Sequence, residues 1–128
     1  MTSGSSFRCF ALSLKRDFAL SLVFAADKTF PTGTYIAEGQ KVTIVFDDKG
    51  QFHVNQSEVT QVSGQYSTKG SQLEITDAQG PWACTKAGEQ SGTYAWKYAD
   101  SALTFSKVKD PCEDRVHSLT QVKWKRQP

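Results

Sequence analysis

The chain has 128 residues, a formal net charge of +2 and 12% aromatic residues. Its length suggests a single domain, and no stretch reaches the roughly 20 apolar residues of a membrane-spanning helix. Three of the 15 basic and one of the 13 acidic residues lie in residues 1–26, which leaves 12 of each in residues 27–128. A neutral body lacks the basic patch of nucleic-acid-binding proteins, so we exclude nucleic acid as a partner.

Residues 1–26 differ in character from the rest and are typical of a signal peptide. A basic pair precedes an apolar run over residues 18–26, in which Val23 and Ala25 have the small-x-small spacing of a cleavage site. We therefore expect cleavage near Ala25 or Ala26 and a periplasmic or secreted domain formed by residues 27–128. The alternatives are a cytoplasmic protein with an amphipathic leader and upstream sequence from a misplaced start.

From residue 32 onward, short runs of alternating apolar and polar residues are separated by turn signals, a pattern that favours strands. Gly50 ends a predicted hairpin turn over residues 47–50, at a position that needs a positive φ. The predicted strands lie at or around residues 32–37, 42–46, 52–54, 59–67, 73–75, 94–98, 103–105 and 119–126.

One short helix is expected near residues 110–118, between the last two strands. Asp110 is a suitable N-cap, Pro111 suits the first helical position, and Glu113 completes a capping box. Eight short strands joined by hairpins predict an all-β fold, an antiparallel up-and-down eight-stranded barrel. Closure of the barrel removes the exposed strand edges.

Two cysteines would remain after cleavage of the leader, Cys84 and Cys112, an even number in a short exported domain. Both lie in predicted loops, and a disulfide between them would close a loop of about 29 residues, a stabilisation of ~3–4 kcal/mol in the chain-entropy model. The alternative is a pair of buried free thiols. The chain has no C-x-x-C motif and no histidine cluster, so we expect no metal site and no cofactor.

Several motifs resemble those of a known family. Gly33-x-Tyr35 near the first strand is similar to the Gly-x-Trp motif of lipocalins and avidins, with Tyr in place of Trp. Further similarity to small bacterial lipocalin-like (calycin-type) domains lies in the stretch 64–77, in the segment Asp110-Pro111-Cys112, and in Arg115 and Leu119. This resemblance covers about residues 32–126. It implies a barrel that binds a hydrophobic or small aromatic molecule, although some related barrels are enzymes and others are secreted inhibitors.

An eight-stranded barrel has room for a packed interior or for one small ligand. Most inward aromatic residues serve simply as core, but several tyrosine hydroxyls together could line a mixed aromatic and polar pocket. Trp82 is expected to cover the barrel mouth and Arg115 to bind a ligand head group, unless Arg115 is instead ion-paired at the barrel end. The predicted ligand-binding residues are Tyr35, Tyr66, Trp82, Tyr94, Trp96, Phe105 and Arg115.

Catalytic signals are sparse. The sequence contains no nucleophile elbow, phosphate loop or metal-ligand spacing, and His117 and Arg115 are the catalytic candidates. Our first hypothesis is an exported, monomeric lipocalin-like barrel whose partner is a small hydrophobic molecule. The alternatives are a small enzyme that uses the barrel cavity and a secreted inhibitor or interaction domain that uses the loop over residues 78–90. The sequence does not decide whether the protein is an enzyme.

Overall fold

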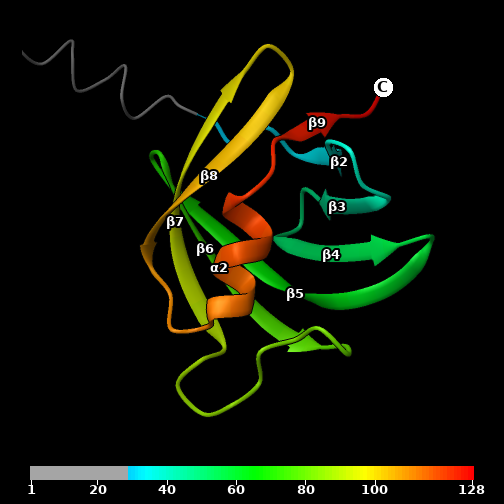
Figure 1. The fold of residues 1–128 in the computed structure, drawn as a ribbon. Helices are drawn as coiled ribbons and strands as arrows, with labels where there is room; N and C mark the ends of the chain where they lie inside the picture. The colour runs from blue at the N-terminus through cyan, green and yellow to red at the C-terminus, as the bar shows by residue number, and fades with distance from the viewer. Residues whose placement is uncertain (1–28) are drawn as a thin grey trace, which may run out of the picture.

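The structure is a computed structural model that describes residues 29–128. Each strand pairs in antiparallel fashion with the next, and the last strand pairs with the first, so that the sheet closes into an eight-stranded barrel (Figure 1). The predicted all-β fold is therefore confirmed, and the barrel is compatible with a lipocalin-like fold. The elements are β2 (Gly33–Ala37), β3 (Val42–Phe46), β4 (Gln51–Gln56), β5 (Val59–Lys69), β6 (Gln72–Gln79), β7 (Ser91–Ala99), β8 (Ala102–Lys109), α2 (Glu113–Thr120) and β9 (Trp124–Arg126).

Alternation along the strands decides which side chains enter the barrel. In β6, the side chains of Leu73, Ile75 and Asp77 are buried, whereas Glu74 between the first two is exposed. This period of two is the geometry of a strand with one face toward a core. The inward position of a carboxylate, Asp77, is the exception in this strand and leads to the site described below.

The turn between β3 and β4 forms where the sequence predicts it, at residues 47–50. The turn between β3 and β4 has Gly50 at a φ of 81°. The carboxylate of Asp47 accepts hydrogen bonds from the backbone N–H groups of Lys49 and Gln51, each at 2.8 Å. An Asp side chain that binds the backbone two residues ahead stabilises a turn of this kind.

Aromatic side chains fill the end of the barrel where this turn lies. Phe30, which precedes the first strand, enters the interior, and its ring centroid lies 5.0 Å from that of Phe46 and 5.2 Å from that of Trp96. Nearby, the hydroxyl of Tyr35 donates to the carbonyl oxygen of Pro31. This half of the interior is a packed core, and we call it the aromatic end.

Helix α2 lies near the opposite end of the barrel, where β2 ends and β3 begins, and we call this the helix end. Figure 1 shows the helix in front of the strands. The N-cap prediction was wrong, because the cap is Cys112, whose Sγ accepts a hydrogen bond from the N–H of Arg115 at 3.4 Å. Asp110 lies three residues before the first helical residue, Glu113, and its carboxylate binds Tyr94, Arg115 and the backbone N–H of Cys112. The predicted last strand was too long, because residues 119–120 still belong to the helix and β9 begins only at Trp124.

Cys84 and Cys112 form the predicted disulfide, with a Cα–Cα distance of 6.4 Å. The bridge ties the loop between β6 and β7 to the start of α2, and Cys112 is buried. Such bridges are typical of proteins in oxidising compartments. The predicted leader at 1–26 lies outside the described residues. Within residues 29–128, no helix has both the length and the apolar character needed to cross a membrane.

Candidate ligand cavity

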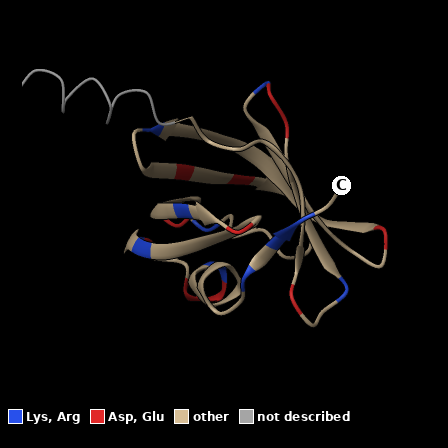
Figure 2. Ribbon diagram, turned by 90° about the horizontal axis from the view of Figure 1, so that it is seen from above, with Lys and Arg blue, Asp and Glu red and all other residues tan. Residues whose placement is uncertain are grey.

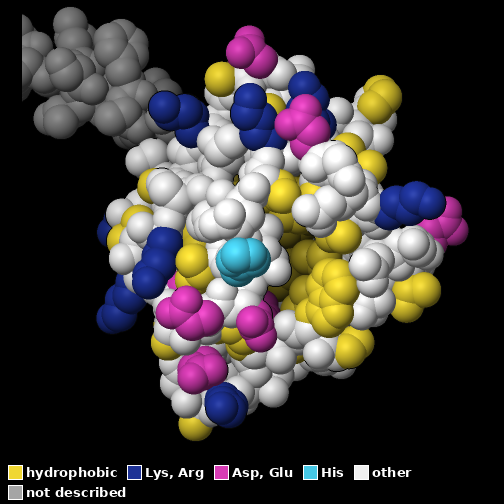
Figure 3. All heavy atoms as spheres, in the orientation of Figure 1, with side chains coloured by type: hydrophobic (Ala, Val, Ile, Leu, Met, Phe, Trp, Pro, Cys, Tyr) yellow, Lys and Arg dark blue, Asp and Glu magenta, His cyan; other side chains and the backbone are white. Residues whose placement is uncertain are grey.

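A cavity of about 610 Å³ occupies the helix end of the barrel. It lies where β2, β4 and β6 end and where β3 and β5 begin, with α2 and the start of β9 completing its wall. The space-filling view shows a hollow lined by apolar side chains on this face (Figure 3). Apolar lining residues include Val42, Val54, Val62, Ile75, Leu119 and Val122.

Polar and aromatic residues form other parts of the cavity wall. Trp82 belongs to the loop between β6 and β7, lines the cavity and is 44% exposed. Its backbone N–H donates to the carbonyl oxygen of Gln61 at 2.9 Å, which fixes the loop against β5. Across the cavity, α2 contributes the exposed His117 and Ser118. The cavity thus combines apolar strand residues with a loop and a helix at its edge.

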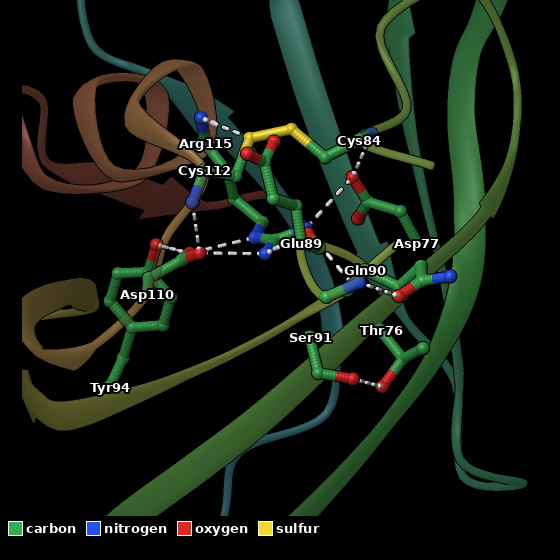
Figure 4. Close-up of polar contacts among 11 residues, drawn as sticks. Thr76, Asp77, Cys84, Glu89, Gln90, Ser91, Tyr94, Asp110, Cys112 and Arg115 are labelled. Carbon is green, nitrogen blue, oxygen red and sulfur yellow. Dashed lines mark hydrogen bonds and ion pairs between the residues drawn. A yellow bond between two sulfur atoms is a disulfide. The ribbon is translucent and has the colours of Figure 1, made fainter. Parts of the chain in front are cut away.

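Arg115 forms the centre of a buried polar network beside the cavity (Figure 4). Its Nε and Nη2 donate to the two carboxylate oxygens of Asp110, each at 2.7 Å. Nη1 donates to the carbonyl oxygen of Gln90 at 3.1 Å, and Nη2 donates to that of Glu89 at 2.9 Å. Nη1 also lies 3.0 Å from Oδ2 of Asp77. All three guanidinium nitrogens are therefore engaged within the protein.

Asp110 is held by partners from three segments. Besides Arg115, it accepts hydrogen bonds from the hydroxyl of Tyr94 in β7 and from the backbone N–H of Cys112, the latter at 2.9 Å. Gly92 makes room for this arrangement, because a Cβ atom there would lie 2.2 Å from Oδ2 of Asp110. A substituted residue 92 would have to displace the carboxylate from its partners.

These contacts also set the protonation states. Burial alone would raise the pKa of Asp110, but hydrogen bonds from Arg115, Tyr94 and Cys112 outweigh it and hold the pKa below its ordinary value. Burial and the hydrogen bond to Asp110 raise the pKa of Tyr94 well above its ordinary value. Burial opposes the charge of Arg115, but its bonds to Asp110 and the charge of Asp77 raise its pKa. Near neutral pH the pair is ionised and Tyr94 is protonated.

Asp77 connects the network to the cavity. It lines the cavity, and its side chain is 4% exposed. Its Oδ2 accepts the backbone N–H of Cys84 at 2.8 Å and is also the oxygen that faces Arg115. Within residues 29–128, Oδ1 accepts no hydrogen bond. Asp77 therefore has one carboxylate oxygen with unused acceptor capacity among the partners that residues 29–128 supply.

The structure divides the residues expected to bind a ligand into two groups. Trp82 and Arg115 line the cavity, as does the catalytic candidate His117. The remaining five lie outside its lining: Tyr35, Tyr66, Tyr94, Trp96 and Phe105. Four of the five belong to the aromatic end, where rings pack against one another, and Tyr94 is committed to Asp110.

Sequence reasoning missed the aliphatic lining and Asp77. Val54 and Val62 line the cavity but were not among the residues predicted to bind a ligand. Asp77 carried a usable signal, because it continues the inward series that begins with Leu73 and Ile75. A carboxylate at an inward strand position needs a partner or a function. The partner of Asp77 is Arg115, which lies too far along the sequence to be recognised from local patterns.

The catalytic candidates lie close in sequence but differ in their surroundings. Arg115 is bound on all sides, whereas the side chain of His117 is exposed and makes no hydrogen bond within residues 29–128. Nothing in the described part of the chain orients this imidazole as a general base would be oriented. The same part contains no group of three or more His, Cys, Asp or Glu residues placed to hold a metal ion.

Comparison of the chain with models of known families, with curated proteins and with solved structures finds no match. Lys, Arg, Asp and Glu are interspersed over the elements (Figure 2), in agreement with the balanced charge of residues 27–128.

Proposed function

We propose that this protein is an exported, lipocalin-like binding protein that holds one small hydrophobic molecule at the helix end of its barrel. The observation that carries the proposal is the contrast between the two ends. The aromatic end is filled by side chains, whereas the helix end has a partly open cavity of about 610 Å³ whose wall combines aliphatic side chains with polar groups. Cavities of ~300–1,000 Å³ with apolar walls and a few polar groups are typical ligand sites.

The construction of the wall supports a preformed site. Arg115 joins Asp77 in β6 to Asp110 before α2, and the disulfide ties the same two regions together. A wall fixed by covalent and ionic links loses little conformational freedom when a ligand enters. Preorganisation of this kind favours affinity.

Export is the second part of the proposal. The disulfide is compatible with an oxidising compartment, and the pattern of residues 1–26 is typical of a signal peptide. We propose a periplasmic or extracellular location, in which a soluble carrier can meet a poorly soluble molecule. Mass spectrometry of the exported protein tests this part, because cleavage near Ala26 would remove the leader; an intact leader on the exported protein would contradict it.

Titration with N-phenyl-1-naphthylamine, a neutral probe that fluoresces in apolar surroundings, tests the binding itself. Val54→Trp places a large side chain in the cavity wall and should abolish the fluorescence increase. Val108→Trp is the matched control, because Val108 is 50% exposed on β8 and does not line the cavity. We expect binding by the wild type and by the control. No binding by the wild type, or equal binding by Val54→Trp, would contradict the proposal.

A further inference from the structure

We infer that the cavity selects an apolar molecule with one ammonium group over the equivalent molecule with a carboxylate. This inference rests on the proposed function and narrows its ligand class. The ionisable side chains of the cavity lining are Asp77, Asp114, Arg115 and His117. Within residues 29–128, no lysine lines the cavity, and Arg115 is the one lining side chain with a permanent positive charge.

Arg115 is not available to an anionic ligand. Each of its nitrogens already faces a carboxylate or carbonyl oxygen at 2.7–3.1 Å. A ligand carboxylate would have to displace one of these partners and leave it buried and unpaired. That exchange is unfavourable because unpaired buried charges are costly.

The charge of the network is not balanced. Two carboxylates, those of Asp77 and Asp110, face one guanidinium, so the buried group carries a net charge of −1. All three side chains are at most 6% exposed, and water therefore screens this charge poorly. Asp114 adds a second negative charge to the lining. The potential inside the cavity therefore favours a cation.

Asp77 provides the point of contact. Its side chain is 4% exposed and lines the cavity, and its Oδ1 accepts no hydrogen bond within residues 29–128. An ammonium head has three donors and a compact charge, so one of them can satisfy Oδ1 while the apolar tail contacts the aliphatic wall. A hydroxyl could donate to the same oxygen but would leave the charge unbalanced.

Three probes with the same alkyl chain separate these effects: decylamine, decan-1-ol and decanoic acid. Each competes with N-phenyl-1-naphthylamine near neutral pH, where the amine is protonated and the acid ionised. We expect the amine to bind the wild type about tenfold or more tightly than the acid, with the alcohol between them. Equal affinities for the three would overturn the inference while leaving the proposed function intact. Failure of the neutral probe to bind would overturn both.

Asp77→Asn removes the unbalanced charge and should abolish the preference for the amine while retaining binding of the neutral probe. Glu74→Gln is the matched control, because Glu74 lies on the same strand with its side chain exposed and outside the cavity. It should preserve the wild-type preference. The same preference in Asp77→Asn as in the wild type would contradict the assignment of Asp77.

If Asp77→Asn does not fold, an NMR measurement on the wild type tests whether the ammonium group binds Asp77. The backbone N–H of Cys84 donates to Asp77 at 2.8 Å, so its NMR resonance reports on that carboxylate. Decylamine should shift this resonance more than decan-1-ol does, because only the amine neutralises Asp77. Equal shifts from the two probes would overturn the inference.

Discussion

At the scale of single residues, Arg115 is a buried cation that links two carboxylates. It is 7% exposed and faces Asp77 and Asp110, which lie on different segments. Removing one partner of such a group leaves buried charges without compensation. The sequence offered two roles for this arginine, a ligand partner or an ion-paired closure of the barrel end. Its contacts correspond to the second.

Arg115→Met tests this role. The variant leaves Asp77 and Asp110 without their cation, so the free energy of unfolding should fall by about 3–5 kcal/mol. Urea denaturation measures the change. Lys125→Met is the control, because Lys125 is exposed on β9 and its loss should change stability by less than about 0.5 kcal/mol. Similar small changes in both variants would refute the structural role of Arg115.

Acid should weaken the same network. The pKa of Asp110 is held below its ordinary value by Arg115, Tyr94 and Cys112. As pH falls below about 4, Asp110 becomes protonated in the unfolded chain but stays ionised in the folded protein. The contribution of Asp110 to the free energy of unfolding therefore declines until the pH has passed the folded pKa. Free energies of unfolding measured at a series of pH values should therefore decrease in this acidic window. Asp110→Asn should show a shallower decrease, and an identical pH profile would contradict the assignment.

At the scale of elements, α2 is positioned by links to the loop before β7. The disulfide reaches this loop at Cys84, and Arg115 reaches it through the carbonyl oxygens of Glu89 and Gln90. The helix is only eight residues long, and isolated helices of this length are not stable in water. Its place in the cavity wall therefore depends on these links and on the packing of Leu119.

Replacing both cysteines, Cys84→Ser with Cys112→Ser, should lower the free energy of unfolding by about 3 kcal/mol, because the unfolded chain regains the freedom of a closed loop. Thermal denaturation with and without dithiothreitol measures the effect. The reductant should lower the melting temperature of the wild type and leave the double variant unchanged. A wild type insensitive to reduction under denaturing conditions would argue against a structural bridge.

Most element boundaries could be predicted from local sequence patterns. Strand alternation located most of the strands, and turn signals such as the one at Gly50 marked their ends. The segment 110–126 was harder to predict, because the expected cap, Asp110, has its carboxylate bound by Tyr94 and Arg115. Local capping rules do not include such distant partners.

At the scale of the whole molecule, the barrel and its disulfide could be inferred, but the place of the cavity could not. Which end of a barrel fills depends on how side chains from distant strands pack. At the aromatic end, Phe30 enters the barrel from a segment before the first strand and fills space between Phe46 and Trp96. Asp77 and Arg115 meet across 38 positions of sequence, so neither marks the cavity by itself.

The most direct test of the central claim is a crystal structure of the protein in complex with N-phenyl-1-naphthylamine. We predict electron density for the probe between α2 and the aliphatic residues of β3, β4 and β5, with the bonds between Arg115 and Asp110 intact. A helix end filled by protein side chains, or a probe bound only outside the barrel, would contradict the account.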